Sequence, residues 1–253
     1  MKDFKEFNAN KATEYLISWI KDYFNENGPQ AKAVIGISGG KDSTVAAALL
    51  VRALGAERVV GVLMPNGSQK DIDDSYKVCE TLGIESYQIN IGPVMDVLTE
   101  EIDDRLFEMK DDNDIYYTNA PARLRMTVLY SVAGFVGGRV VNTSNYSERF
   151  IGYSTKYGDS AGDFSPFGNY TVREVLAIGE CLGVAPELLY KAPEDGMSGK
   201  TDEEKIGFSY KALDDYIING IEPEPEVSEK IKKMHEISAH KRNPMPIAPF
   251  FRS

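Results

Sequence analysis

The stretch AVIGISGGKDS, residues 33–43, decides the fold. Its first half is short, apolar and rich in β-branched residues, as expected of a strand buried in a parallel sheet. Two glycines and two serines then lead into a helix of small residues that runs from about Ser43 to Leu54. The N-terminus of a helix offers free N–H groups and a positive dipole end, and glycine lets the backbone approach a ligand closely. The stretch therefore predicts a strand, a phosphate-binding loop and a helix in succession.

Two other glycine-loop motifs do not fit. A Walker A loop requires GxxxxGK[ST], but Ile35 stands at the first glycine position and Asp42 follows the lysine. A dinucleotide fingerprint, GxGxxG, is not supplied by Gly36, Ser38 and Ser43. Asp42 alone would repel a phosphate, so it suggests a Mg²⁺ ion that bridges carboxylate and phosphate. A glycine turn that merely links strand to helix would not need this set of Ser and Asp residues.

The periodicity of the remaining chain places further elements around this unit. Apolar residues recur at helical spacing before it, and short β-branched runs alternate with helical segments after it. This alternation predicts an α/β fold with an open parallel sheet and helices on both faces. The polar segment 110–119 is expected to be mobile, and the long Gly/Ser/Tyr/Asp-rich segment 144–169 to be functional. The predicted strands are 33–38, 59–64, 86–91 and 139–143, and the helices 12–24, 43–54, 72–82, 93–108, 122–136, 172–182 and 225–239.

Composition limits the classes of function. The 253 residues fit one domain, 1–253, and the net charge of −11 argues against nucleic acid as the main partner. Cys79 and Cys181 form no CxxC pair and are expected to be buried thiols, and two histidines cannot build a His₃ zinc site. No signal-peptide run and no stretch of roughly 18 apolar residues is present, so we expect a cytoplasmic protein without membrane association.

With its strand and helix, the loop Ser38–Ser43 resembles the SGGxDS loop of the pyrophosphate-forming ATP hydrolases of the adenine-nucleotide α-hydrolase type. The resemblance implies a Rossmann-like fold and a loop that binds the pyrophosphate part of ATP. By itself the loop does not choose among NAD synthetases, GMP synthetases, asparagine synthetases and tRNA-modifying enzymes.

Six further blocks resemble NAD synthetases, in the same order and over nearly the whole chain. They are MPNGSQKD (64–71), NAPARLRM (119–126), NTSNYSE (142–148), TKYGD (155–159), TDEE (201–204) and HKR (240–242). Thr143 also follows a predicted strand, at the edge where open α/β sheets bind ligands.

The resemblance assigns roles to individual residues. It implies that Asp42 and Glu148 bind Mg²⁺, and we expect Asp159 to accept a proton from ammonium. The dinucleotide residues it implies are Arg123, Lys156, Asp163, His240 and Lys241. The positions it gives to ATP are Gly36, Ile37, Ser38, Gly39, Gly40, Lys41, Asp42, Ser43, Thr143, Val172 and Glu194.

The reaction implied by the resemblance is amidation of deamido-NAD. Its nicotinate carboxylate attacks ATP to give an acyl-adenylate and pyrophosphate, and ammonia then displaces AMP to give NAD. The chain has no room for a glutaminase domain of ordinary size, so free ammonia is the expected nitrogen donor. The resemblance also implies a homodimer. Two alternatives stay open: a related adenylating ligase that acts on another carboxylate, and a non-catalytic nucleotide-binding relative.

Two positions depart from the family pattern. Val172 stands where the family usually has Lys, and Glu194 where it usually has Ser or Thr. Losing a cation and gaining an anion near phosphates is expected to weaken ATP binding. Lys191 or Arg173 is the expected compensating cation.

Overall fold

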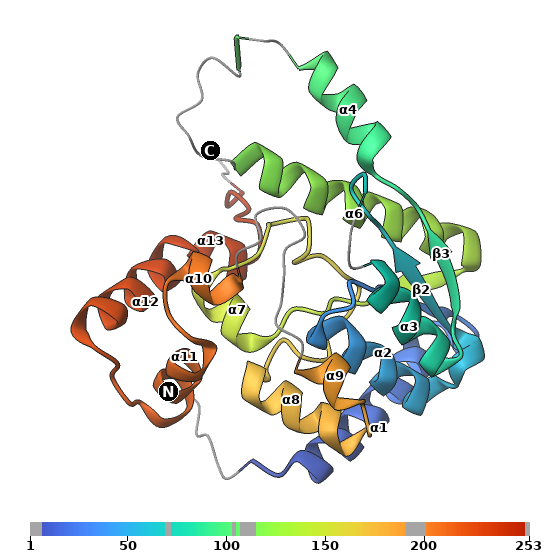
Figure 1. Ribbon diagram of the computed structural model, residues 1–253, viewed down its shortest axis with the longest axis horizontal. Coiled ribbons are helices and arrows are strands. Elements are labelled where there is room, and N and C mark those ends of the chain that lie inside the picture. Colours follow the sequence, from blue (N-terminus) through green and yellow to red (C-terminus); the bar gives the residue numbers. More distant parts are fainter. Residues whose placement is uncertain (1–6, 69–71, 103–104, 107–114, 191–200, 251–253) are drawn as a thin grey trace.

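The computed structural model describes residues 7–68, 72–102, 105–106, 115–190 and 201–250. Its centre is a four-stranded sheet in the order β3-β2-β1-β4, and all neighbouring strands are parallel (Figure 1). The strands are β1 (Lys32–Gly36), β2 (Val59–Leu63), β3 (Glu85–Gln88) and β4 (Gly138–Val140). This arrangement confirms the predicted α/β fold.

Both faces of the sheet are covered because successive side chains of a strand point to opposite faces. In β1, Ala33 and Ile35 pack with the helices before and after the strand, while Val34 packs on the other side with Val132 and Ala133 of a long helix. The two faces thus belong to two separate apolar clusters. All these side chains are buried, as expected of a parallel sheet between helices.

The helices fall into three groups. Those against the first face include α1, α2, α3, α8 and α9, and α6 covers the second face. A smaller apolar cluster of Ile151, Val172, Ile206, Leu213 and Ile231 joins α7, α8, α10, α11 and α12 beside the sheet. The helices are α1 (Ala9–Asn27), α2 (Lys41–Leu54), η1 (Ala56–Arg58), α3 (Ile72–Leu82), α4 (Gly92–Glu101), α6 (Ile115–Val136), α7 (Tyr146–Ile151), α8 (Val172–Cys181), α9 (Pro186–Leu189), α10 (Asp202–Ile206), α11 (Tyr210–Asn219), α12 (Pro225–Ile237) and α13 (Ala239–Arg242).

Three local predictions were wrong, and one segment predicted only to be functional contains a helix. Helix α6 begins at Ile115, so residues 115–119 are helical and Pro121 lies inside the helix. Strand β4 ends at Val140, after which only an isolated bridge joins Val141 to Phe164. The segment 144–169 contains helix α7. Cys181 is exposed, because it lies at the solvent side of the last turn of α8, whereas Cys79 is buried as expected.

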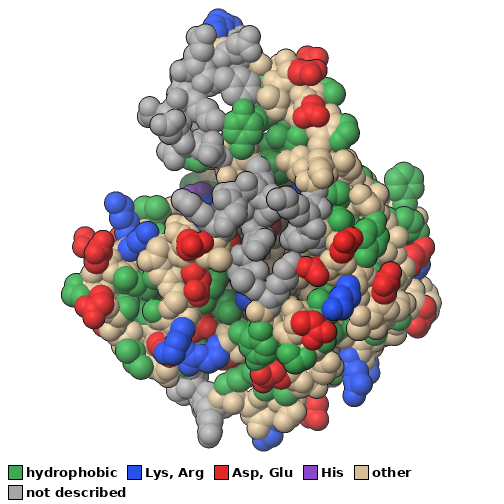
Figure 2. Space-filling view, in the orientation of Figure 1, with side chains coloured by type: hydrophobic (Ala, Val, Ile, Leu, Met, Phe, Trp, Pro, Cys, Tyr) green, Lys and Arg blue, Asp and Glu red, His purple; other side chains and the backbone are tan. Residues whose placement is uncertain are grey.

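The surface agrees with the composition. On the face drawn in Figure 2, acidic and basic side chains are interspersed, and hydrophobic side chains reach the surface toward α4 and α6. Among the described residues, no helix is long and apolar enough to cross a membrane.

Candidate active site

The loop after β1 has the geometry of an anion-binding turn. Gly39 has a φ of 75°, which favours glycine, and a Cβ there would lie 3.0 Å from the Cβ of Asp74. Gly40 is the N-cap of α2, and no side chain of the described residues caps this helix. The hydroxyls of Ser38 and Ser43 lie 3.1 Å apart at the mouth of the loop. Hydroxyls and first-turn N–H groups therefore face one spot, as phosphate binding requires.

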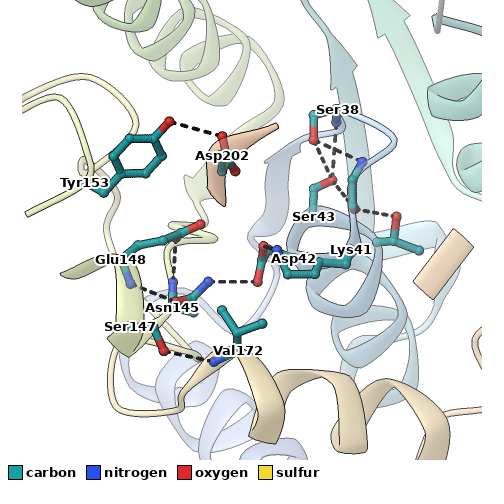
Figure 3. A network of polar contacts seen from close by, with 12 residues as sticks. Ser38, Lys41, Asp42, Ser43, Asn145, Ser147, Glu148, Tyr153, Val172 and Asp202 are labelled. Atoms are coloured by element: carbon teal, nitrogen blue, oxygen red, sulfur yellow. Dashed lines mark hydrogen bonds and ion pairs between the residues drawn. The ribbon is translucent and has the colours of Figure 1, made fainter. Parts of the chain in front are cut away.

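The two predicted metal ligands, Asp42 and Glu148, are far apart in sequence but both contact Asn145. Asn145 Nδ2 donates to Asp42 Oδ1 at 3.1 Å across 103 residues. Asn145 is also the N-cap of α7 in a capping box with Glu148, whose carboxylate accepts from Asn145 N at 3.1 Å. Figure 3 shows Asp42 and Glu148 on either side of the Asn145 side chain. The buried Asn145 thus contacts both carboxylates, Asp42 through its side-chain amide and Glu148 through its backbone N–H.

The electrostatics of this pair suit a divalent cation. Burial, and then the charge of Asp42, raise the pKa of Glu148 to about 8. Such mutual destabilisation is relieved when a cation lies between two carboxylates. Among the described residues no group of three or more His, Cys, Asp or Glu side chains is placed to hold a metal. Mg²⁺ commonly uses one or two carboxylates together with substrate phosphates, so Asp42 and Glu148 fit an ion shared with a nucleotide.

A buried lysine and tyrosine complete this corner. Lys41 Nζ lies 2.9 Å from Asp42 Oδ2 and 5.4 Å from the centre of the Tyr210 ring. Burial by itself lowers the Lys41 pKa, but the charges of Asp42 and Glu148 outweigh it and raise the pKa above its usual value. The Tyr210 hydroxyl is buried, and none of the residues that the structure describes forms a hydrogen bond with it. On the far side, Asp202 of α10 accepts from the Tyr153 hydroxyl at 3.1 Å (Figure 3).

Three of the predicted dinucleotide residues come together from separate segments. Arg123 of α6 donates from Nε to the Lys156 carbonyl at 3.3 Å, and Lys156 Nζ donates to the His240 carbonyl at 2.6 Å. Lys241 makes separate contacts: its Nζ donates to the carbonyls of Gly152 and Ser154. A cationic group thus forms where α6, the segment after α7 and α13 meet.

Asp159 and Asp163 lie in the same region with different surroundings. Asp159 Oδ1 accepts from Thr155 N at 2.6 Å, and burial raises its pKa. Asp163 Oδ2 instead accepts from Val140 N at 2.7 Å, and its other oxygen lies 3.4 Å from the Tyr130 hydroxyl. The Asp163 carboxylate therefore secures the outer edge of β4. Thr143 follows that strand and is half-buried.

Val172 lies in an apolar wall. It is 6% exposed and lines a cavity of about 580 Å³ together with Lys41, Leu176 and Tyr210. Arg173 does not point into this cavity as a free cation, because its Nη2 pairs with Asp215 at 2.6 Å. Lys41 therefore places its ammonium beside Val172, which sequence reasoning did not anticipate. Lys191 and Glu194 lie outside the described residues.

Asn145 and Tyr210 are the site residues that sequence reasoning missed. The spacing Asn145-x-x-Glu148 is a capping-box signal and could have identified α7 and its N-cap. Tyr210 carries no such signal, since it reaches the site only through the packing of α11 against α7 and α8.

A parallel sheet, an SGGxDS loop after β1 and a carboxylate pair facing that loop define a nucleotide-binding protein of the adenine-nucleotide α-hydrolase fold. Residues 12–245 match the family described as NAD synthase. The NH(3)-dependent NAD(+) synthetase of Pyrococcus furiosus is 37% identical over 259 residues, which cover 97% of this chain and 96% of that protein. The chain belongs to the NAD synthase family and is a ligase that forms a carbon–nitrogen bond.

Solved structures agree with this membership. An NMN synthetase from Francisella tularensis is 33% identical with a TM-score of 0.85, covering 97% of this chain and all of its own. An NH3-dependent NAD synthetase from Campylobacter jejuni, in complex with the nitrate ion, is 26% identical with a TM-score of 0.76 and covers 96% of this chain. These two structures carry different product names, which bears on the substrate.

Proposed function

We propose that this chain amidates deamido-NAD with free ammonia, consuming ATP and releasing NAD, AMP and pyrophosphate. One observation carries the proposal: the segment 142–148 contacts both halves of the site. Asn145 donates to Asp42 of the phosphate loop, and Asn142 Nδ2 donates to the Asp159 carbonyl at 2.8 Å. The loop that would receive pyrophosphate and the acid that would receive a proton are thus joined through one short segment.

The proposed chemistry assigns a task to each group. The nicotinate carboxylate is a poor electrophile, and transfer of AMP onto it provides a good leaving group. Ser38, Ser43 and the first-turn amides of α2 hold the pyrophosphate as it departs. Asp42 and Glu148 would hold Mg²⁺, which supplies charge stabilisation at the phosphates. Asp159, whose pKa is raised by burial, would accept a proton from ammonium, and the resulting ammonia is the nucleophile.

The cationic group suits the other end of the substrate. Arg123, Lys156 and His240 would bind the phosphates of the dinucleotide, and Lys241, whose charge interacts with Asp159, would bind the same ligand. Thr143 and Val172 would contact ATP, while the role of Asp163 would be to orient β4 and with it the ligand. The ammonia-dependent relatives match over nearly their whole length, which supports free ammonia and a single synthetase domain, 1–253. The acidic charge and the absence of a membrane-spanning helix among the described residues support a cytoplasmic enzyme without a nucleic acid partner.

A second candidate substrate is the mononucleotide that corresponds to NMN. The similarity to the Francisella tularensis NMN synthetase favours it. The mononucleotide offers the same carboxylate to Asp159 and the phosphate loop, but it lacks the adenylate half. The two substrates therefore differ in how much binding energy they contribute, not in the reaction they undergo.

The experiment measures kcat/KM for both substrates with saturating ATP, Mg²⁺ and ammonium. We expect the dinucleotide to be preferred by about tenfold or more, because additional contacts remote from the reacting atoms stabilise the transition state. Lys156→Met should reduce this preference, since its ammonium lies in the cationic group away from the phosphate loop. A preference for the mononucleotide would replace the first candidate by the second.

We further propose a homodimer formed through α4 and α6. Phe135 is 92% exposed on α6, and Val94 and Val97 are more than half exposed on α4, where hydrophobic side chains reach the surface in Figure 2. Phe135→Glu should weaken self-association by about 100-fold or more, because an unpaired carboxylate buried between subunits is costly. Light scattering over a dilution series measures this effect. Tyr15→Glu on α1, 62% exposed in the wild type, is the matched control. A monomeric wild type, or an unchanged dimer in Phe135→Glu, would contradict the proposal.

A further inference from the structure

Lys41 occupies an unusual position between the carboxylates and the phosphate loop. It is the first residue of α2, directly after Gly40, and its ammonium pairs with Asp42. The Lys41 side chain is only 11% exposed and that of Asp42 18%. Its charge also interacts with Glu148 and Asp202, so three acids face one ammonium. This ammonium is paired with Asp42 in the structure (Figure 3).

Both oxygens of Asp42 already face a donor, because Oδ1 accepts from Asn145 Nδ2 at 3.1 Å and Oδ2 lies 2.9 Å from Lys41 Nζ. A Mg²⁺ ion bound to Asp42 would lie about 2.0–2.1 Å from a carboxylate oxygen. Lys41 Nζ lies 2.9 Å from Oδ2 of that group, so the two cations would be close neighbours in a site shielded from water. Like charges repel strongly at such distances when solvent is excluded. Cation binding therefore requires the ammonium to move.

The structure offers the ammonium one direction of movement. Val172, Leu176 and the Tyr210 ring form the apolar part of the cavity wall. The carboxylates that line the same cavity already have partners: Asp215 pairs with Arg173 and Lys211, Asp214 accepts from Arg173 N, and Glu203 accepts from Tyr210 N. In the phosphate loop, three and two residues away along the chain, lie the Ser38 and Ser43 hydroxyls, which would hold phosphate under the proposed function. A lysine has a flexible four-carbon stem and three rotatable donors, so it can turn between these two positions without a change in the backbone.

We propose that Lys41 is an exchangeable counter-ion: its ammonium holds Asp42 and Glu148 in the free protein and transfers to the nucleotide phosphates when a divalent cation takes its place. Cation and nucleotide then bind cooperatively. The cation replaces the Lys41 ammonium beside Asp42 and Glu148, and the nucleotide phosphates accept the released ammonium. The inference rests on the proposed function in taking Asp42 and Glu148 as the cation ligands and the Ser38–Ser43 loop as the phosphate site.

The test measures Mn²⁺ binding by calorimetry and by electron paramagnetic resonance, with and without a non-hydrolysable ATP analogue. Lys41→Met removes the ammonium and keeps the length and apolar stem of the side chain. Without nucleotide, Lys41→Met should bind Mn²⁺ about tenfold or more tightly than the wild type, which is the order of one lost charge–charge interaction. With the analogue the advantage should shrink or reverse, since the wild type then gains a contact between Lys41 and phosphate.

Two control variants make the result specific. Lys211→Met removes a cation from the rim of the same cavity, where Lys211 pairs with Asp215, and should leave Mn²⁺ affinity unchanged. Lys41→Arg keeps the charge and should bind Mn²⁺ as weakly as the wild type, which separates charge from side-chain shape. Melting curves show whether each variant is folded, and Lys41→Arg keeps the inference testable if Lys41→Met is not.

The outcomes are distinct from those of the proposed function. Mn²⁺ affinity of Lys41→Met within about twofold of the wild type, or weaker, overturns the counter-ion role. So does the absence of detectable Mn²⁺ binding in every variant. If Mn²⁺ binding tightens while the wild type forms no NAD, Lys41 keeps its role and the proposed reaction is wrong. If the wild type forms NAD and Mn²⁺ binding does not tighten, only the inference about Lys41 is lost.

Discussion

Asp42→Asn is expected to lower kcat/KM for AMP release by about 100-fold or more, since metal-site substitutions one shell further out already cost about 10–100-fold. The amide keeps an oxygen that can accept from Asn145, so the contact between α2 and α7 persists. It removes the negative charge that a divalent cation requires and leaves the Lys41 ammonium without its nearest partner.

The folded state of Asp42→Asn should remain close to that of the wild type. An acid in the first turn of a helix contributes only about 0.3–1 kcal/mol through the helix dipole, and loss of the ion pair with Lys41 removes an attraction that was partly offset by desolvation. Melting temperature and AMP release are measured together. Asp215→Asn, which removes a half-buried acid of the same cavity that pairs with Arg173 and Lys211, is the control for activity and should keep AMP release near wild type. Normal turnover by Asp42→Asn would remove this residue from the site.

Glu148→Gln is expected to lower kcat/KM by about 100-fold as well. Unlike Asp42→Asn, it is also expected to raise the stability of the folded protein at high pH. Burial raises the folded-state pKa of Glu148 from 4.5 to about 8. The folded state therefore holds a proton that the unfolded state releases, and stability declines as pH rises from 4.5 through about 8. Glutamine stays neutral, and its side-chain oxygen can still accept from Asn145 N in the capping box. Without divalent cation, Glu148→Gln should melt higher than the wild type at pH 9 and nearly equally at pH 5.

Glu174→Gln provides the matched control for this variant. Glu174 occupies the same capping-box position in α8, where it accepts from Thr171 N at 2.8 Å, but it faces no phosphate loop. It should keep wild-type activity and show no gain in stability at pH 9. A Glu148→Gln protein that is active, or one that melts lower than the wild type at pH 9, would show that Glu148 is not the strained carboxylate of a cation site.

The central strands β1 and β2 were predictable from sequence because each is a short apolar run with β-branched residues. The start of α6 was not, since Pro121 and the polar residues before it favour a break that packing of the helix on β1 and β4 overrides. Helix α7 was not predicted, because it lies in a segment rich in glycine and serine. Its capping box, Asn145 and Glu148, is nevertheless recognisable in the sequence. Local sequence signals thus predicted the elements that are buried along their whole length. They did not predict element boundaries that depend on tertiary contacts.

Some features of the candidate site were likewise predictable from the sequence, and others were not. The positions of Asp42, Glu148, Arg123 and Lys156 follow from motifs, and the structure brings them together in two groups. The direction of the Lys41 side chain could not be predicted, because it depends on three acids from three segments and on the Tyr210 ring. Nor could the sequence show that Asp163 is engaged with the backbone of β4.

The most direct measurement follows the nitrogen and the phosphates of one reaction. Purified protein is mixed with ATP, Mg²⁺, deamido-NAD and either ¹⁵N-ammonium or ammonia-free glutamine, and NAD, AMP and pyrophosphate are quantified. We predict that ammonium gives labelled NAD, AMP and pyrophosphate in equal amounts, and that glutamine gives none. Equal rates with glutamine, ADP in place of AMP, or ATP cleavage without NAD would contradict the account.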